Sequence, residues 1–220
     1  MFKKFKRNMQ IKKYTLLGNA IKETYLKNYD KITNHVELSD DVFIKQFIIV
    51  SWHQGIGAML HFLLVTKPPK LAVIMSNNPQ NFICIPLFEH LNIEIIRQDE
   101  NDTNAFARAK QIHHYLTEGY SIFNFSDGPN GPSKVFKKDM LFFSKKYKIP
   151  ILPLIATADN YTLLRKSWDQ SYLLNAKTSQ FWVRNDVSMV VTDLEKDALT
   201  ITKQLNELES ELFELRDSTK

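Results

Sequence analysis

Residues 123–134 read Phe-Asn-Phe-Ser-Asp-Gly-Pro-Asn-Gly-Pro-Ser-Lys, so an acid and a base flank two Gly-Pro steps. Glycine admits positive φ and proline fixes φ, so two such steps in succession predict a stiff, exposed loop. A polar loop after a buried strand is where α/β proteins commonly bind their ligands. We therefore expect Asp127 and Lys134 to be held at a functional site, although an isolated Asp-Gly-Pro would indicate only a turn.

A second strand-like run, residues 47–52, leads directly into a histidine, His53. The run is β-branched and aromatic without a turn former, which is typical of a buried strand. An imidazole titrates near neutral pH, so His53 is the candidate general base for taking a proton from a hydroxyl group. The alternative is a structural histidine at a strand end.

Apolar strand-like runs alternate with helical patterns along the rest of the chain. Continuous apolar runs argue that both faces of a sheet are covered, so the sequence predicts a three-layer α/β domain with a largely parallel sheet. The expected strands are 47–52, 71–76, 93–96, 121–125, 151–156 and 187–192. The expected helices are 56–65, 104–118, 139–147 and a last one with an apolar stripe over 201–215.

The composition indicates an ordinary globular protein of 220 residues and a single cysteine, Cys84. One cysteine excludes an intrachain disulfide and suits a reducing compartment. We expect no signal peptide, because the basic start has no apolar core behind it, and no membrane-spanning helix. We divide the single domain into a basic segment and helix, 1–40, and an α/β body, 41–220.

The net charge of +5 is concentrated near the N-terminus. Residues 1–13 carry no acid and six bases: Lys3, Lys4, Lys6, Arg7, Lys12 and Lys13. Basic residues near an anionic bilayer each contribute on the order of 1 kcal/mol before salt screening. The segment therefore predicts either an anionic membrane tether, with apolar contact from Leu17, Ile21 and Tyr25, or a solvated end ahead of a packing helix. No nucleic-acid-binding motif accompanies the charge, so we expect no nucleic-acid partner.

Several short motifs together resemble a known family. They are Trp52-His53, Arg97 after an apolar strand, Asp127-Gly128-Pro129-x-Gly131-Pro132, Ile149-Pro150-x-x-Pro153 and Ser167-Trp168-Asp169. Their order and spacing resemble a bacterial branch of the lysophospholipid acyltransferase-like superfamily that was catalogued as a domain of unknown function. The resemblance covers residues 47–191, and it implies a glycerolipid-acyltransferase-like fold.

The resemblance also implies a chemistry. The expected activity is transfer of a fatty acyl group from a thioester, acyl-CoA or acyl carrier protein, to a hydroxyl of a lipid or lysophospholipid-like acceptor. His53 would be the base and Asp127 its candidate support, without a bound cofactor or metal. Substrate or phosphate binding would fall to Arg97, Gly128, Pro129, Gly131 and Lys134. The protein would work peripherally, on the cytoplasmic face of a membrane. Trp168 is expected to pack, and Asp169 to brace a loop without catalysing.

The sequence also departs from the family pattern. Ala58 stands where the wider superfamily has the acid of its His-x-x-x-x-Asp motif, and Asn77-Asn78-Pro79-Gln80 replaces an Arg-Asp-Gly element. Asn130 replaces an arginine, and Arg97 is followed by Gln98-Asp99-Glu100 instead of a small polar segment. Two alternatives therefore stay open: a catalytically weak relative that binds lipid or acyl carrier, and a scaffold that binds a protein through its last helix.

Overall fold

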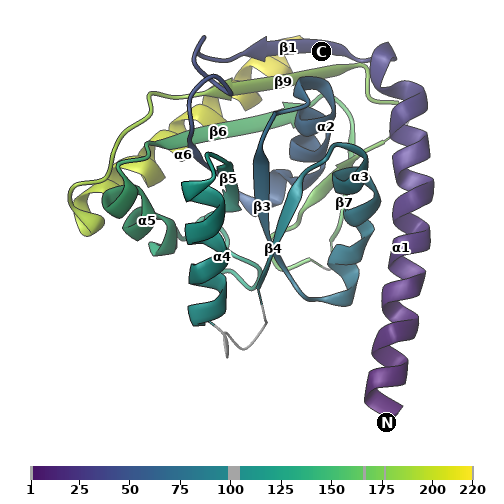
Figure 1. The fold of residues 1–220 in the computed structure, drawn as a ribbon. Coiled ribbons are helices and arrows are strands. Elements are labelled where there is room, and N and C mark those ends of the chain that lie inside the picture. The colour runs from purple at the N-terminus through teal and green to yellow at the C-terminus, as the bar shows by residue number, and fades with distance from the viewer. Residues whose placement is uncertain (1, 99–104, 166, 176, 220) are drawn as a thin grey trace.

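A seven-stranded sheet forms the centre of the molecule in the computed structural model, which describes residues 2–98, 105–165, 167–175 and 177–219 (Figure 1). The strand order is β1-β9-β6-β2-β5-β3-β4. Neighbouring strands are parallel except β6 and β9, which run antiparallel. The strands are β1 Thr33–Glu37, β2 Ile48–Ser51, β3 Leu71–Ser76, β4 Glu94–Gln98, β5 Ser121–Phe125, β6 Ile151–Ala158 and β9 Gln180–Asn185.

Helices cover both faces of this sheet, which confirms the predicted α/β class with a largely parallel sheet (Figure 1). One face packs against α2 (Ile56–Thr66) and α3 (Ile85–His90), and α1 (Phe2–Asn28) lies outside them. The other face packs against α4 (Ala105–Thr117), α5 (Asp139–Tyr147) and α6 (Leu194–Ser218). The predicted stripe on the last helix faces this second core, where Ile201, Leu205 and Leu212 are buried.

The strands predicted as continuous apolar runs lie in the middle of the sheet. All four residues of β2 and all eight of β6 are buried, because helices cover them from both sides. Strands 71–76 and 121–125 have the predicted bounds. The predicted helices are observed as well, although Asn104, the expected start of α4, lies outside the described residues.

The strand predicted at 187–192 is wrong. That segment forms only an isolated bridge from Met189 to Ile151, and Val187 is 75 % exposed. The strand in this region is β9, which ends just before residue 187. Its Phe181, Trp182 and Val183 are buried, and the polar Arg184 and Asn185 follow them. The polar edge strand β1 was also not predicted, because its sequence Thr-Asn-His-Val-Glu lacks an apolar run.

A small second sheet lies beside α2. It consists of β7 (Tyr161–Leu163) and β8 (Tyr172–Leu174), which pair antiparallel. A Cβ on Gly57, in the first turn of α2, would lie 2.4 Å from the carbonyl oxygen of Tyr172 and 2.6 Å from Leu173 Cα. Only glycine admits this approach, so the connection between β7 and β8 is held close to the start of α2.

The long helix α1 packs through its second half. A Cβ on Gly18 would lie 2.3 Å from the carbonyl oxygen of Ile83, in the 3₁₀ turn η3 (Pro79–Ile83). Arg7 donates a hydrogen bond to the carbonyl of Asn77, and Tyr25 packs against the core. Among the helices that the structure describes, none combines the length and apolar character that crossing a bilayer would require.

Candidate active site

His53 lies where strand β2 ends. The strand runs through Ser51, and His53 begins a 3₁₀ turn, η2 (His53–Gly55), that leads into α2. Strands β2 and β5 are parallel neighbours with Ser51 opposite Phe125, so the loop after Phe125 and the turn after Trp52 lie at the same sheet edge. His53 and the Asp-Gly-Pro loop are therefore neighbours.

The acid that contacts the His53 imidazole is Asp169. Its Oδ2 lies 2.6 Å from His53 Nδ1, and its side chain is fully buried. Asp169 comes from the connection between β7 and β8, which the close approach at Gly57 holds beside α2. Asp169 therefore supplies the acid beside the imidazole, whereas Ala58, a buried residue of α2, supplies none.

Two serines hold the Asp169 carboxylate in place. Ser171 donates to it from its backbone N–H, at 3.0 Å, and from its hydroxyl, at 2.6 Å, and the hydroxyl of Ser167 also donates. Burial alone would raise the pKa of Asp169, but the hydrogen bonds from His53, Ser167 and Ser171 hold it well below its usual range. Asp169 is therefore an ionised acceptor at neutral pH, so Nδ1 of His53 donates to it, and in the neutral tautomer that makes this bond the lone pair is on Nε2.

Asp127 contacts the backbone of the His53 turn instead of the imidazole. It is fully buried; its Oδ1 accepts the N–H of His53 at 3.0 Å, and its Oδ2 accepts the N–H of Lys134 at 3.2 Å. Burial raises the pKa of Asp127, and these hydrogen bonds oppose that rise. Asp127 thus ties both ends of the Asp-Gly-Pro loop to the turn that carries His53.

Two aromatic rings enclose the imidazole. The Phe125 ring lies 5.0 Å from the His53 ring at 64°, and the Trp168 ring lies 5.4 Å away at 37°. Trp168 in turn packs on the Asp-Gly-Pro loop, because a Cβ on Gly131 would lie 2.6 Å from its ring. Trp168 packs as predicted, yet it stays 39 % exposed and forms the outer wall beside His53.

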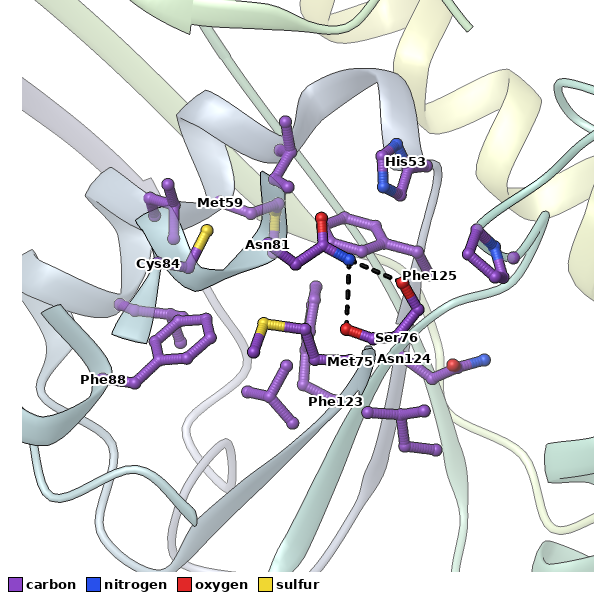
Figure 2. A pocket seen from close by; sticks show the side chains of 17 residues that line it. His53, Met59, Met75, Ser76, Asn81, Cys84, Phe88, Phe123, Asn124 and Phe125 are labelled. Atoms are coloured by element: carbon purple, nitrogen blue, oxygen red, sulfur yellow. Dashed lines mark hydrogen bonds between the residues drawn. The ribbon is translucent and has the colours of Figure 1, made fainter. Parts of the chain in front are cut away.

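An apolar pocket opens beside His53 (Figure 2). Its walls come from α2, β3, β5 and the η3–α3 segment, and Gly128 and Pro129 of the loop complete the rim. In Figure 2 the labelled His53 stands at one end of the group, and Cys84 and Phe88 stand at the other. The polar side chains of Ser76 and Asn81 are hydrogen-bonded to each other, because Asn81 Nδ2 donates to Ser76 Oγ at 2.7 Å.

The two cations predicted to bind phosphate, Arg97 and Lys134, lie in different surroundings. Arg97 lies on the edge strand β4, outside the pocket lining, with its guanidinium 4.8 Å from the Phe82 ring centre. Burial lowers the pKa of Arg97, and its buried Nη1 has no hydrogen-bond partner among the described residues. The acidic Asp99 and Glu100 that follow lie outside the described residues.

The lysines after the loop differ in their partners. Lys134 forms an ion pair with Glu209 of α6, and Lys138 forms one with Glu195. The Lys137 ammonium lies against Gly128, where a Cβ on that glycine would be 2.6 Å away. Asn130 is exposed at the tip of the loop. Within the described residues, no cluster of histidine, cysteine and acid side chains is arranged to hold a metal ion.

The role of Asp169 at His53 is the feature that the sequence analysis missed. The residue was expected to brace a loop, which it does through Ser167 and Ser171, but it also binds the imidazole from 116 positions along the chain. The available signal was the Ser-Trp-Asp element together with the missing acid at Ala58. Nothing in the local pattern shows that an irregular segment returns to a distant strand end.

Comparisons with known proteins support the fold. No model of a known protein family matches the chain, and no curated protein matches it significantly. Among solved structures, the chain is similar to the crystal structure of the 1-acyl-sn-glycerophosphate acyltransferase PlsC from Thermotoga maritima. The TM-score is 0.55 at 15 % identity, and the match covers 94 % of this chain and 82 % of that one. The likeness shows that the two chains share the acyltransferase-like fold.

The packing of Gly131 on Trp168 yields a prediction with a matched control. Gly131 and Gly119 both have positive φ, +70 and +80, so alanine is strained at either position. Only Gly131→Ala also drives a methyl group into the Trp168 ring, whereas the nearest atom to a Cβ at Gly119 is 4.0 Å away. We expect Gly131→Ala to be the less stable variant by about 1–3 kcal/mol, measured by thermal unfolding of both. Equal melting temperatures would contradict this packing.

Proposed function

We propose that the protein transfers a fatty acyl group from a thioester donor to a hydroxyl group of a lipid or lysophospholipid-like acceptor. One observation carries the proposal: His53, bound through Nδ1 to the buried Asp169, lines an apolar pocket. A base held in one tautomer suits proton removal, and a concave apolar pocket suits a largely apolar ligand. The acyltransferase-like fold is consistent with this chemistry.

The reaction follows from the positions of the two side chains. Nε2 of His53 takes the hydroxyl proton as the acceptor oxygen attacks the thioester carbonyl carbon. The tetrahedral intermediate collapses, the carbon–sulfur bond breaks, and the imidazolium returns its proton to the leaving thiolate. Asp169 stabilises the imidazolium between these two steps, because a nearby carboxylate favours the charged ring. The products are an ester and a free thiol, and no metal or redox step is needed.

The pocket is the candidate site for the acyl chain. Met59, Leu63, Phe88 and Phe123 supply apolar walls from three different elements, α2, α3 and β5. Burying each methylene of a chain is worth about 0.8 kcal/mol, so an apolar pocket would favour an acyl chain that enters it. We place the thioester carbonyl beside His53 and the chain toward Phe88. The donor would be acyl-CoA or acyl carrier protein.

The phosphate group of the acceptor or of the donor would be bound by Arg97 and Lys134. Arg97 has a buried Nη1 that lacks a protein partner in the described structure, and a guanidinium pairs with phosphate in a bidentate way. Lys134 would first have to leave Glu209. Gly128, Pro129 and Gly131 shape the loop, and Gly128 and Pro129 face the pocket directly.

A second candidate function is a weak or inactive relative that binds lipid or acyl carrier. The substitutions at Ala58, Asn77, Asn78 and Asn130 favour it. The contact between His53 and Asp169 weighs against it, because an acid holds the imidazole despite Ala58. Thioester cleavage by the purified protein separates these two functions, and vesicle binding separates both from a protein scaffold.

The base assignment makes a direct prediction. His53→Ala should lower the rate of acyl transfer by about 10²–10⁴-fold, the range usual for a general base, and it should also lower the melting temperature, because the buried Asp169 carboxylate loses one partner. The assay follows a labelled acyl thioester in the presence of lipid acceptors. His90→Ala, an exposed histidine on α3, is the matched control and should keep the wild-type rate. Full activity in His53→Ala would remove the proposal and favour a binding protein.

We also propose that α1 attaches the protein to an anionic membrane at its cytoplasmic face. Ile21 is half-buried and Tyr25 packs on the core, so the apolar contact cannot come from them. Phe5, Met9 and Leu16 instead share the opposite face of the helix and are 59–63 % exposed. The first turn of α1 has no acid, although anions are preferred at a helix N-terminus. Anionic headgroups would compensate the partial positive charge at the N-terminus of this helix.

Removal of residues 1–13 tests the attachment. We expect a chain that starts at Tyr14 to fold, since Gly18 and its contact with Ile83 remain. Its binding to anionic vesicles should fall strongly relative to the full chain, and added salt should weaken the full chain toward the same level. Sedimentation with anionic and with neutral vesicles measures both effects. Equal binding of the two chains to anionic vesicles would overturn the role of α1.

A further inference from the structure

The last helix, α6, contacts the segments around His53 from the face of the sheet opposite α2. Two polar side chains of this helix, Asn206 and Glu209, are three residues apart and therefore lie on the same side of it. Asn206 Oδ1 accepts the indole N–H of Trp52 at 3.1 Å, and the Glu209 carboxylate pairs with the Lys134 ammonium. The helix therefore contacts both the residue that precedes His53 and the residue that follows the Asp-Gly-Pro loop.

The contact at Glu209 continues to His53 through a series of hydrogen bonds. The Lys134 side chain pairs with Glu209, and the Lys134 backbone N–H donates to Asp127 Oδ2 at 3.2 Å. The other oxygen of this fully buried carboxylate, Asp127 Oδ1, accepts the N–H of His53 at 3.0 Å. Lys134 is thus fixed at its side chain by α6 and at its backbone by the residue that holds the His53 turn.

The pair between Lys134 and Glu209 is not an ordinary surface ion pair. Glu209 is only 8 % exposed, and a buried carboxylate is stable only with a partner, so losing Lys134 would leave an unpaired buried charge. Lys134 also has a φ of +58, a left-handed conformation that persists in a residue other than glycine only where tertiary contacts hold it. By contrast, the side chain of Glu211, on the same helix, is 62 % exposed beside Arg184.

We propose that Glu209 and Lys134 are positioning residues. Their ion pair holds the Asp-Gly-Pro loop and, through Asp127, holds the His53 turn in the geometry that the base needs. The contacts themselves stand in the free protein, whereas their effect on turnover rests on the proposed function. This role competes with phosphate binding by Lys134, because a lysine that leaves Glu209 for a phosphate group releases the loop.

The two roles of Lys134 predict opposite kinetics for Glu209→Gln, which keeps the shape of the side chain and removes its charge. If the pair positions the loop, kcat for acyl transfer should fall roughly ten- to hundredfold, as expected when a reacting group is misplaced. The KM values for palmitoyl-CoA and for a lysophospholipid acceptor should then hardly change. If Lys134 instead binds phosphate, the variant frees it, so one of these KM values should fall while kcat is kept, and that result would overturn the proposal.

A second variant and a matched control complete the kinetic test. Lys134→Met should lose kcat as Glu209→Gln does, and the combined variant should stay within about threefold of Glu209→Gln, because all three remove the same interaction. Glu211→Gln, which removes an exposed ion pair from the same helix, should keep the wild-type kcat. Losses that multiply in the combined variant contradict a role through the pair.

Amide hydrogen exchange, followed by NMR, tests the same contacts without an activity assay. The N–H groups of His53 and Lys134 both donate to Asp127, so Glu209→Gln should speed their exchange by roughly tenfold or more, and Glu211→Gln should not. Faster exchange in a protein that transfers no acyl group supports the positioning and removes only the proposed function. Unchanged exchange of both amides, or faster exchange with the wild-type kcat, overturns the proposal.

Discussion

The hydrogen bond between His53 Nδ1 and Asp169 Oδ2 joins two parts of the chain that no local pattern connects. One end comes from the central strand β2, and the other comes from the connection between β7 and β8. The bond is short, its acid is fully buried, and serines satisfy the remaining carboxylate positions. An ionised buried acid is stable only with such partners, so the position of His53 and the conformation of the β7–β8 connection depend on each other.

Two close approaches make this bond geometrically attainable. Gly57 lets the backbone of β8 lie against α2, and Gly131 lets the Trp168 ring lie against the Asp-Gly-Pro loop. Asp127 then fixes that loop to the His53 turn through two backbone amides. The acid beside the imidazole thus comes from a distant part of the chain through tertiary structure. Ala58, in the first turn of α2, offers no acid, and the imidazole nevertheless has a carboxylate partner.

The central fold follows from the sequence because its signal is local. Strands β3 and β5 are apolar runs bounded by polar turns, and burial on both faces requires that composition. β9 was not predicted because the polar Arg184 and Asn185 follow its short apolar run. The apolar segment 187–192 was predicted as the strand instead, and it forms only an isolated bridge. His53 and the Asp-Gly-Pro loop follow two apolar strand runs that the sequence does show, and parallel pairing of those strands brings their ends to one edge. The contact of Asp169 with the imidazole was not predicted, because long-range contacts of an irregular segment leave no periodic trace.

A double-mutant cycle on acyl transfer tests the dependence of His53 on Asp169 most directly. The variants are His53→Ala, Asp169→Asn and the combination, each assayed with a labelled acyl thioester and a lipid extract. If the pair acts as a unit, Asp169→Asn alone should lose roughly 10²–10⁴-fold in rate, and the combination should be within about threefold of His53→Ala. Losses that multiply in the combined variant, or an Asp169→Asn variant with the wild-type rate, would contradict the assignment of Asp169 to the imidazole.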